Sequence, residues 1–271
     1  PSVKDVIQNT ASNYTTSGGF GPNQVSTLLG LGMVAFVVRF FMKSPTLFLK
    51  ILNLSLLGAV SFRALVTFSR GGVFAAIIVI ASFLYLLYLQ SKLRKKKEII
   101  SLFVLLVLGS VITWTITVDQ TGGLLENRYT NKDVIGREKE DISTGRVDLF
   151  LNELEGFESH PFLGVGASGM KQYRLEVEGK IIASHNEISR LLSEHGMLGI
   201  IILLLLIFTP LAYRSRNKRN ILFYAFLAFW FATINHSAMR IAAPGFVYAL
   251  ALLNITYDQR PVHRKRLARP R

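Results

Sequence analysis

Apolar stretches alternate with short polar connections along most of this 271-residue chain, and their lengths indicate the fold class. A hydrocarbon core roughly 30 Å thick is crossed by about 20 helical residues at a rise of about 1.5 Å each. Apolar runs of about that length cover residues 25–42, 47–68, 72–89, 99–118, 197–213, 221–236 and 241–257. The pattern predicts an all-α protein, a bundle of about seven membrane-spanning helices.

One polar segment, residues 119–193, is much longer than the other connections and divides the chain into three parts. Residues 1–118 comprise an N-terminal tail and four predicted spans. Residues 194–271 comprise three predicted spans and a basic tail. Because spanning helices do not readily host ionisable groups, the long segment is the expected place for chemistry.

The long segment contains two stretches with helical character. Apolar residues recur at helical spacing from Val147 to Phe157, which predicts an amphipathic helix lying on the membrane or against the bundle. His160-Pro161 is expected to end it, because the residue before a proline is biased away from helix. A second helix is expected over residues 186–194, leading into the fifth span.

Basic residues give the chain a net charge of +14 and gather in short connections and at the C-terminus. Such clusters mark the cytoplasmic side, because they resist translocation. The clusters are Lys43 and residues 92–97, 214–219 and 260–271. With alternating spans, the N-terminal tail, the turns at residues 69–72 and 237–240 and the long segment fall together on the extracytoplasmic face. The charge therefore predicts a lipid bilayer as partner and no nucleic acid.

Composition narrows the possible chemistry further. There is no cysteine, which excludes a disulfide, a thiolate nucleophile and a cysteine metal site. No HExxH or DxD-type spacing occurs, so no metal is expected. ATP and nicotinamide cofactors are not normally available outside the cytoplasm, so no cofactor is expected and the reaction must use an activated bond in the substrate. Glu153, Glu155 and Glu158 could pair for glycoside hydrolysis, but a solvated helix face is the simpler interpretation.

Arg70 is the first candidate for substrate binding. The apolar stretch 47–89 is interrupted only at Ser69-Arg70-Gly71-Gly72, where a guanidinium could clamp phosphate oxygens beside glycines that admit a ligand to the backbone. The alternative is an interfacial anchor. Arg63 lies seven residues earlier on roughly the same helical face. Because arginine within the hydrocarbon costs about 2.5–3.5 kcal/mol, Arg63 is expected to face a partner or a polar cavity and is a second substrate-binding candidate.

Arg146 and His185 are the candidates in the long segment. Arg146 begins the predicted amphipathic helix, and a helix N-terminus with an arginine beside it attracts anions; the alternative is a solvated arginine. His185 precedes the second predicted helix, and an imidazole with a pKa of about 6.5 or lower can accept a proton near pH 7. The alternative is a structural histidine, since His160, His195 and His236 lie on or near the same face.

Several ordered motifs resemble the O-antigen ligase and polymerase family of bacterial membrane enzymes. They are Gly21-Pro22-Asn23-Gln24, Ser69-Arg70-Gly71-Gly72, Thr144-Gly145-Arg146, His160-Pro161-Phe162-Leu163-Gly164-Val165-Gly166, Ser184-His185-Asn186-Glu187 and Glu194-His195-Gly196-Met197-Leu198-Gly199. Each motif alone is weak, but their order and spacing cover nearly the whole chain. Family members usually have more spans, so the resemblance implies that this chain is the C-terminal part of a longer protein.

The resemblance implies a metal-independent, inverting glycosyl transfer on the periplasmic face of the bacterial inner membrane. The donor would be a glycan on undecaprenyl pyrophosphate, and the acceptor a sugar hydroxyl of lipid A core or of a growing glycan. By position, Arg70 and Arg146 match the family's pyrophosphate-binding arginines, and His185 matches its proposed catalytic base. Physical reasoning agrees on one point, because two preorganised arginines stabilise a pyrophosphate leaving group as its charge develops.

Two other functions fit parts of the pattern. A polymerase that joins repeat units of the same polysaccharide shares every motif above. A transporter subunit would require paired charges or broken helices at mid-membrane, whereas the ionisable residues here gather outside, with Arg63 as the main exception.

Overall fold

A computed structural model describes residues 3–141, 143, 145–179, 182, 184–216, 222–236 and 241–253. Apart from an isolated bridge between Lys132 and Glu138, the regular structure in these ranges is helical, which confirms the predicted all-α class. Several expected features lie outside the described residues: Thr144, the basic residues beyond 216, the turn at 237–240, the outer ends of the last two spans and the basic tail.

Within the described ranges, five helices are long and apolar enough to cross a membrane. They are α2 (Pro22–Met42), α3 (Leu47–Leu65), α4 (Arg70–Gln90), α5 (Leu93–Gln120) and α9 (Glu187–Arg216). The sixth and seventh predicted spans correspond to shorter apolar helices, α10 (Leu222–Ile234) and α11 (Ala242–Leu252). The protein is therefore a multi-pass helical membrane protein.

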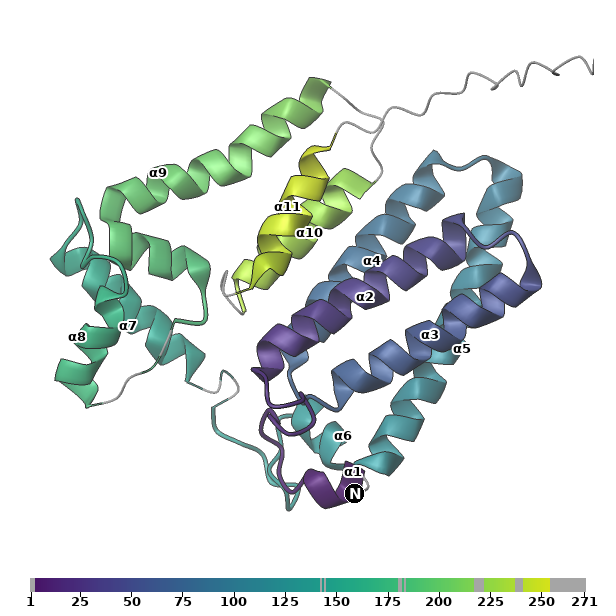
Figure 1. Ribbon diagram of the computed structural model, residues 1–271, viewed down its shortest axis with the longest axis horizontal. Coiled ribbons are helices and arrows are strands. Elements are labelled where there is room, and N and C mark those ends of the chain that lie inside the picture. The colour runs from purple at the N-terminus through teal and green to yellow at the C-terminus, as the bar shows by residue number, and fades with distance from the viewer. Residues whose placement is uncertain are drawn as a thin grey trace, which may run out of the picture.

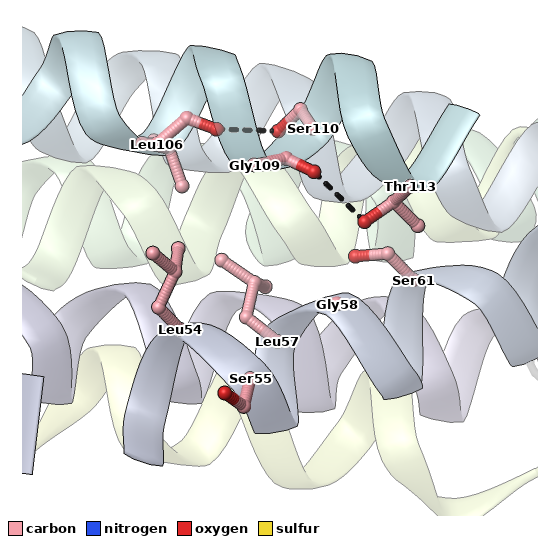
Figure 2. Close-up of a pocket in the computed structure, with 9 residues that line it drawn as sticks. All are labelled: Leu54, Ser55, Leu57, Gly58, Ser61, Leu106, Gly109, Ser110 and Thr113. Atoms are coloured by element: carbon pink, nitrogen blue, oxygen red, sulfur yellow. Dashed lines mark hydrogen bonds between the residues drawn. The ribbon is translucent and has the colours of Figure 1, made fainter. Parts of the chain in front are cut away.

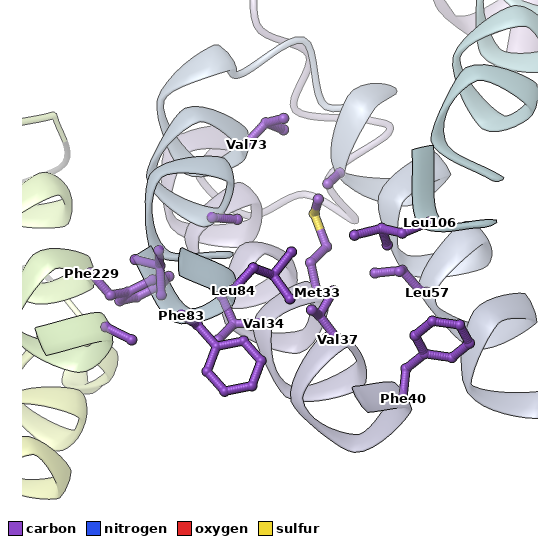
Figure 3. Close-up of a cluster of buried hydrophobic side chains, with 14 of the residues drawn as sticks. Met33, Val34, Val37, Phe40, Leu57, Val73, Phe83, Leu84, Leu106 and Phe229 are labelled. Atoms are coloured by element: carbon purple, nitrogen blue, oxygen red, sulfur yellow. The ribbon is translucent and has the colours of Figure 1, made fainter. Parts of the chain in front are cut away.

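The core lies where α2 packs between α3 and α4, with α10 on the far side of α4 (Figure 1). Figure 3 shows the buried apolar side chains that meet there, and Phe229 joins them from α10. Val37, Ala76, Val79 and Phe83 are completely buried. Burial of such side chains stabilises a fold by about 1.5–3 kcal/mol each in water, although lipid reduces that gain and leaves close packing to hold the helices together.

α5 joins the bundle through α3, along small residues that let the two backbones approach (Figure 2). A Cβ at Gly58 would lie 3.4 Å from the hydroxyl of Thr113, and one at Gly109 would lie 3.3 Å from Leu54. The hydroxyls of Ser110 and Thr113 donate to carbonyls of their own helix. Small residues at helix contacts are typical of membrane proteins, where packing drives helix association.

The long polar segment folds into short helices that lie beside the bundle in Figure 1. They are α6 (Leu124–Tyr129), α7 (Arg146–Ser159) and α8 (Gly169–Glu178), and a further short helix, α1 (Val3–Val6), lies near the N-terminus. The predicted amphipathic helix is confirmed as α7, which ends immediately before His160. The second predicted helix is also present, as the first part of α9.

The buried face of α7 is not the one its apolar residues suggested. Val147 and Leu151 are 55% and 50% exposed, whereas Glu153 is buried. The carboxylate of Glu153 accepts hydrogen bonds from Arg174 of α8 and Ser189 of α9. The solvated position expected for Glu153 is therefore wrong, because a buried arginine on a neighbouring helix supplies the counter-charge that a carboxylate needs away from water.

The two glycine motifs around residues 160–166 and 194–199 dock against each other. α9 kinks at Gly196, whose φ of 58° favours glycine. The carbonyl oxygens of Ser193 and Glu194, freed by the kink, accept from the backbone N–H groups of Val165 and Gly166 at 2.8 and 3.1 Å. These motifs therefore hold the bend in α9 and fix α7 beside it.

Replacing Gly196 by alanine is expected to destabilise this bend by about 1–3 kcal/mol, because the backbone is left-handed there and a Cβ would lie 2.5 Å from the carbonyl oxygen of Pro161. Thermal unfolding of the purified protein in detergent checks this. Gly245→Ala in α11 is the matched control, since no described atom beyond its own stretch of helix lies within 4 Å of its Cβ position and helical alanine is favoured over glycine. An unchanged midpoint for Gly196→Ala would contradict the account.

Replacing Glu153 by alanine is expected to destabilise the packing of α7, α8 and α9 by about 3–5 kcal/mol, because it leaves the charge of the fully buried Arg174 unpaired. Hydrogen exchange of the α7 and α8 amides measures this directly. Glu155→Ala removes an exposed carboxylate from the same helix and should change the exchange free energy by no more than about 0.5 kcal/mol. Equal protection in the two variants would show that the buried pair does not hold the helices together.

Candidate functional site

A cavity of about 500 Å³ lies where the beginning of α4 meets the beginning of α2, the end of α6, the start of α7 and the end of α10. We call it the arginine pocket, because Arg70, Arg128 and Arg146 line it together. Phe74, Ala75, Ile78 and Ala232 form its apolar wall, and Asn23, Ser69, Gly71, Ser143 and His236 complete the lining. Two of the predicted site residues, Arg70 and Arg146, therefore share one cavity.

Arg70 reaches this cavity because α4 begins directly against α2. A Cβ on Gly72 would lie 2.3 Å from the hydroxyl oxygen of Ser26, so this position has room for glycine alone. Ser26 donates a hydrogen bond to the Ser69 carbonyl at 3.0 Å, and the Ser69 hydroxyl lies 2.7 Å from the Oδ1 of Asn23. The motifs around residues 21–24 and 69–72 thus form one packed unit, and Arg70 is the first residue of the helix it starts.

Two hydrogen bonds connect Arg128 to this packed unit. Its Nε donates to the carbonyl of Phe68 at 3.0 Å, and its own carbonyl accepts from Nη1 of Arg70 at 3.2 Å. Sequence reasoning missed this residue. Its position in the sequence does indicate a candidate, since Arg128 follows the fourth span and lies on the same predicted side of the membrane as Arg146.

Arg146 begins α7 and is set by the turn before it. The carboxylate of Asp141 accepts from the backbone N–H groups of Ser143 and Gly145 at 2.7 and 2.5 Å. Gly145 has a φ of 76°, a left-handed conformation that glycine adopts without strain. The turn therefore fixes where α7 begins and where its first side chain points.

The three arginines repel one another. Burial, followed by the charges of Arg70 and Arg146, lowers the pKa of Arg128 to about 10, and burial followed by Arg70 lowers the pKa of Arg146. Among the described residues that line the pocket, none is acidic. Both arginines stay charged at neutral pH, so an anion that enters the pocket would relieve their repulsion.

His236, which follows α10, lies against the glycines of the α4 turn. A Cβ on Gly71 would lie 2.2 Å from Cδ2 of His236. Burial is the main cause that lowers the pKa of His236 to about 4; a hydrogen bond with the Ala232 carbonyl opposes it, and the charges of Arg146 and His185 lower the pKa by smaller amounts. The imidazole is neutral near pH 7 and adds no further positive charge to the pocket.

His185 lines a second, adjoining cavity of about 210 Å³, which we call the histidine pocket. Its lining also includes Asn23, Arg128 and Arg146, the three residues that it shares with the arginine pocket. Ser12, Tyr14, Pro22 and Leu149 complete it. The structure thus brings His185 to Arg146 but places it beside the cavity of Arg70 and not within it.

Arg63 lies in neither pocket. It is exposed in the last turn of α3, and its Nη2 donates to the carbonyl of Thr16 at 3.3 Å. Arg63 was expected to face a partner or a polar cavity; it lines neither of these two cavities, and its substrate-binding role stays a prediction. The N-terminal segment supplies its partner instead, a backbone oxygen that the sequence pattern did not place.

Comparison with known proteins identifies the family. A family model described as O-antigen ligase matches residues 54–204, more than half of the chain. An uncharacterized protein of Haemophilus influenzae is 29% identical over 164 residues, which cover 55% of this chain and 39% of that protein. The matched part thus spans well under half of that relative, and no solved structure matches. On the strength of the family match, this chain belongs to the O-antigen ligase family.

Proposed function

We propose that the protein is a membrane glycosyltransferase of the O-antigen ligase type. It transfers a glycan from undecaprenyl pyrophosphate to a sugar hydroxyl of lipid A core on the periplasmic face of the bacterial inner membrane, without a metal. The observation that carries the proposal is the arginine pocket, where three guanidinium groups converge and the described lining supplies no carboxylate to neutralise them. A pyrophosphate would provide the missing negative charge.

The two adjoining pockets suggest how donor and acceptor are arranged. The pyrophosphate of the donor lies in the arginine pocket, whose apolar wall at Phe74, Ala75 and Ile78 suits a lipid-linked molecule. The acceptor sugar lies in the smaller histidine pocket, beside His185. Arg128 and Arg146 belong to both pockets, so the reacting atoms meet next to these two side chains.

The reaction follows from this arrangement. The acceptor hydroxyl oxygen attacks the anomeric carbon of the donor glycan from the face opposite the pyrophosphate, which inverts the configuration. The bond from the anomeric carbon to the pyrophosphate oxygen breaks, and the electron pair leaves with the pyrophosphate. His185 accepts the proton of the attacking hydroxyl group. The arginines stabilise the negative charge that develops on the leaving pyrophosphate, and they do so more strongly in the transition state than in the substrate.

Replacing Arg70, Arg128 or Arg146 by alanine is expected to lower kcat/KM for glycan transfer by about 100–1,000-fold each, the usual effect of removing one preorganised donor to a developing oxyanion. The full-length protein in liposomes, given its lipid-linked glycan and purified acceptor, is the system for this measurement. Arg63→Ala is the matched control, because Arg63 lies in neither pocket. Transfer by Arg128→Ala at the rate of Arg63→Ala would remove Arg128 from the mechanism.

Replacing His185 by alanine is expected to lower kcat by about 100–10,000-fold, the range for loss of a general base, and to remove the decline in rate at acidic pH. A pH–rate profile of glycan transfer measures both effects. His160→Ala removes an exposed histidine at the end of α7 and should leave the profile unchanged. A profile for His185→Ala that keeps the acidic limb would assign the base to another group.

The surface glycan of a deletion strain tests the type of transfer. Loss of a ligase leaves long glycan chains that are not attached to lipid A core, whereas loss of a polymerase leaves single repeats. Gel profiles of the extracted glycan distinguish the two outcomes, and single repeats would assign the protein to polymerisation.

A further inference from the structure

An apolar groove of about 550 Å³ runs between α4 and α5 and is floored by α2 and α3. Ile77, Ala81 and Leu84 line it from α4, and Phe103, Val107 and Trp114 line it from α5. Its size is within the range of about 300–1,000 Å³ that is usual for small-molecule pockets. Ile77, Phe103 and Val107 are about half exposed, so one side of the groove is open. A molecule in the surrounding lipid could therefore enter from the side.

The groove adjoins the arginine pocket. Along α4, Phe74, Ala75 and Ile78 line the pocket, while Ile77 and Ala81 line the groove, so the two cavities share adjacent faces of one helix. The ring of Tyr129 stands between them. Its centroid lies 5.9 Å from that of Phe74 in the pocket and 5.0 Å from that of Trp114 in the groove, both in edge-on contact.

The direction of the groove suits a long chain. Trp114 lies near the end of α5 that leads to α6, whereas Phe103 lies 11 residues deeper, or about 16 Å along the helix. On α4, across the groove, Leu84 lies seven residues, or about 10 Å, further from the start of the helix than Ile77. The groove thus starts at the level of the arginine pocket and descends into the hydrophobic part of the bundle.

We propose that the groove between α4 and α5 binds the isoprenoid tail of the donor, which passes the Phe74–Tyr129–Trp114 cluster to reach its pyrophosphate in the arginine pocket. This inference rests on the proposed function. One molecule with an anionic head and a long apolar chain matches a cationic cavity and an apolar groove that lie side by side along α4. Because the tail takes no part in bond breaking, its contacts strengthen substrate and transition state equally and affect KM, while kcat stays unchanged.

Photocrosslinking locates the tail directly. The full-length protein carries p-benzoylphenylalanine at Val107 in the groove or, as a matched control, at Ile112, which lies on the same helix, is 59% exposed and is outside the groove lining. The probe is radiolabelled undecaprenyl pyrophosphate in phosphatidylglycerol nanodiscs. We expect a crosslink at Val107 at least about fivefold stronger than at Ile112, which unlabelled undecaprenyl pyrophosphate abolishes. Equal labelling at both positions, or no labelling at Val107, would show that bilayer lipid or another protein segment fills the groove.

A second measurement separates the tail from the head. Ala81→Phe fills the groove, and Ile112→Phe places the same aromatic ring outside it. We expect Ala81→Phe to raise KM about tenfold for a donor with an undecaprenyl chain, without changing kcat, and to leave KM unchanged for the same glycan on a ten-carbon prenyl chain. The same effect on both donors, or on neither, would overturn the tail site even though transfer itself stands. Absence of transfer from either donor by the unaltered protein would overturn the proposed function instead.

Discussion

The site depends on the close approach of three backbone segments at the start of α4. Gly72 lies against Ser26 of α2, and Gly71 lies against the ring of His236 after α10, at distances that leave no room for a Cβ. Because side chains are absent there, three segments far apart in sequence meet around Arg70. The carbonyl of Phe68 then accepts from Arg128, whose own carbonyl accepts from Arg70. A few glycine contacts thus determine where two of the cations lie.

The positive charges of the arginine pocket destabilise one another and lack an acidic partner among the described lining residues. Burial and mutual repulsion lower the pKa of Arg128 and Arg146, so the protein bears an electrostatic cost to hold these groups together. Elsewhere the same structure neutralises its buried charges, as the pairing of Glu153 with Arg174 shows. The contrast between a paired buried arginine and a cluster whose described lining includes no acidic residue supports the proposal of an anionic substrate in the arginine pocket.

The long polar segment positions two of the candidate site residues, Arg146 and His185. α7 presents Arg146 at its first position, and His185 lies just before α9. An ion pair joins α7 to α8, and backbone hydrogen bonds join residues 165 and 166 to the kink in α9. These contacts fix the start of α7 relative to the start of α9. The glycines at 164, 166 and 196 therefore have a structural role, since they hold the two motifs together.

Much of the fold could be predicted from the sequence, because each span has a run of apolar residues of membrane-crossing length, and α7 has apolar residues at helical spacing followed by His160-Pro161. The last two spans were harder, since α10 and α11 are short within the described residues. The hydropathy pattern did not predict which segments contact one another. Periodicity shows that a residue belongs to a helix but not which neighbour faces it, and for this reason Glu153 was expected in solvent.

The candidate site, like the fold, was predicted from the sequence only in part. The sequence by itself determined which residues carry suitable chemistry and that Arg70, Arg146 and His185 belong to one predicted side of the membrane. Only the tertiary structure decided that Arg128 joins the two arginines, that His185 stands in an adjoining pocket and that Arg63 turns to the carbonyl of Thr16. The physical reason is that hydropathy and charge act along the chain and select the side of a membrane, whereas a cavity forms only where packed backbones fix side-chain directions in three dimensions.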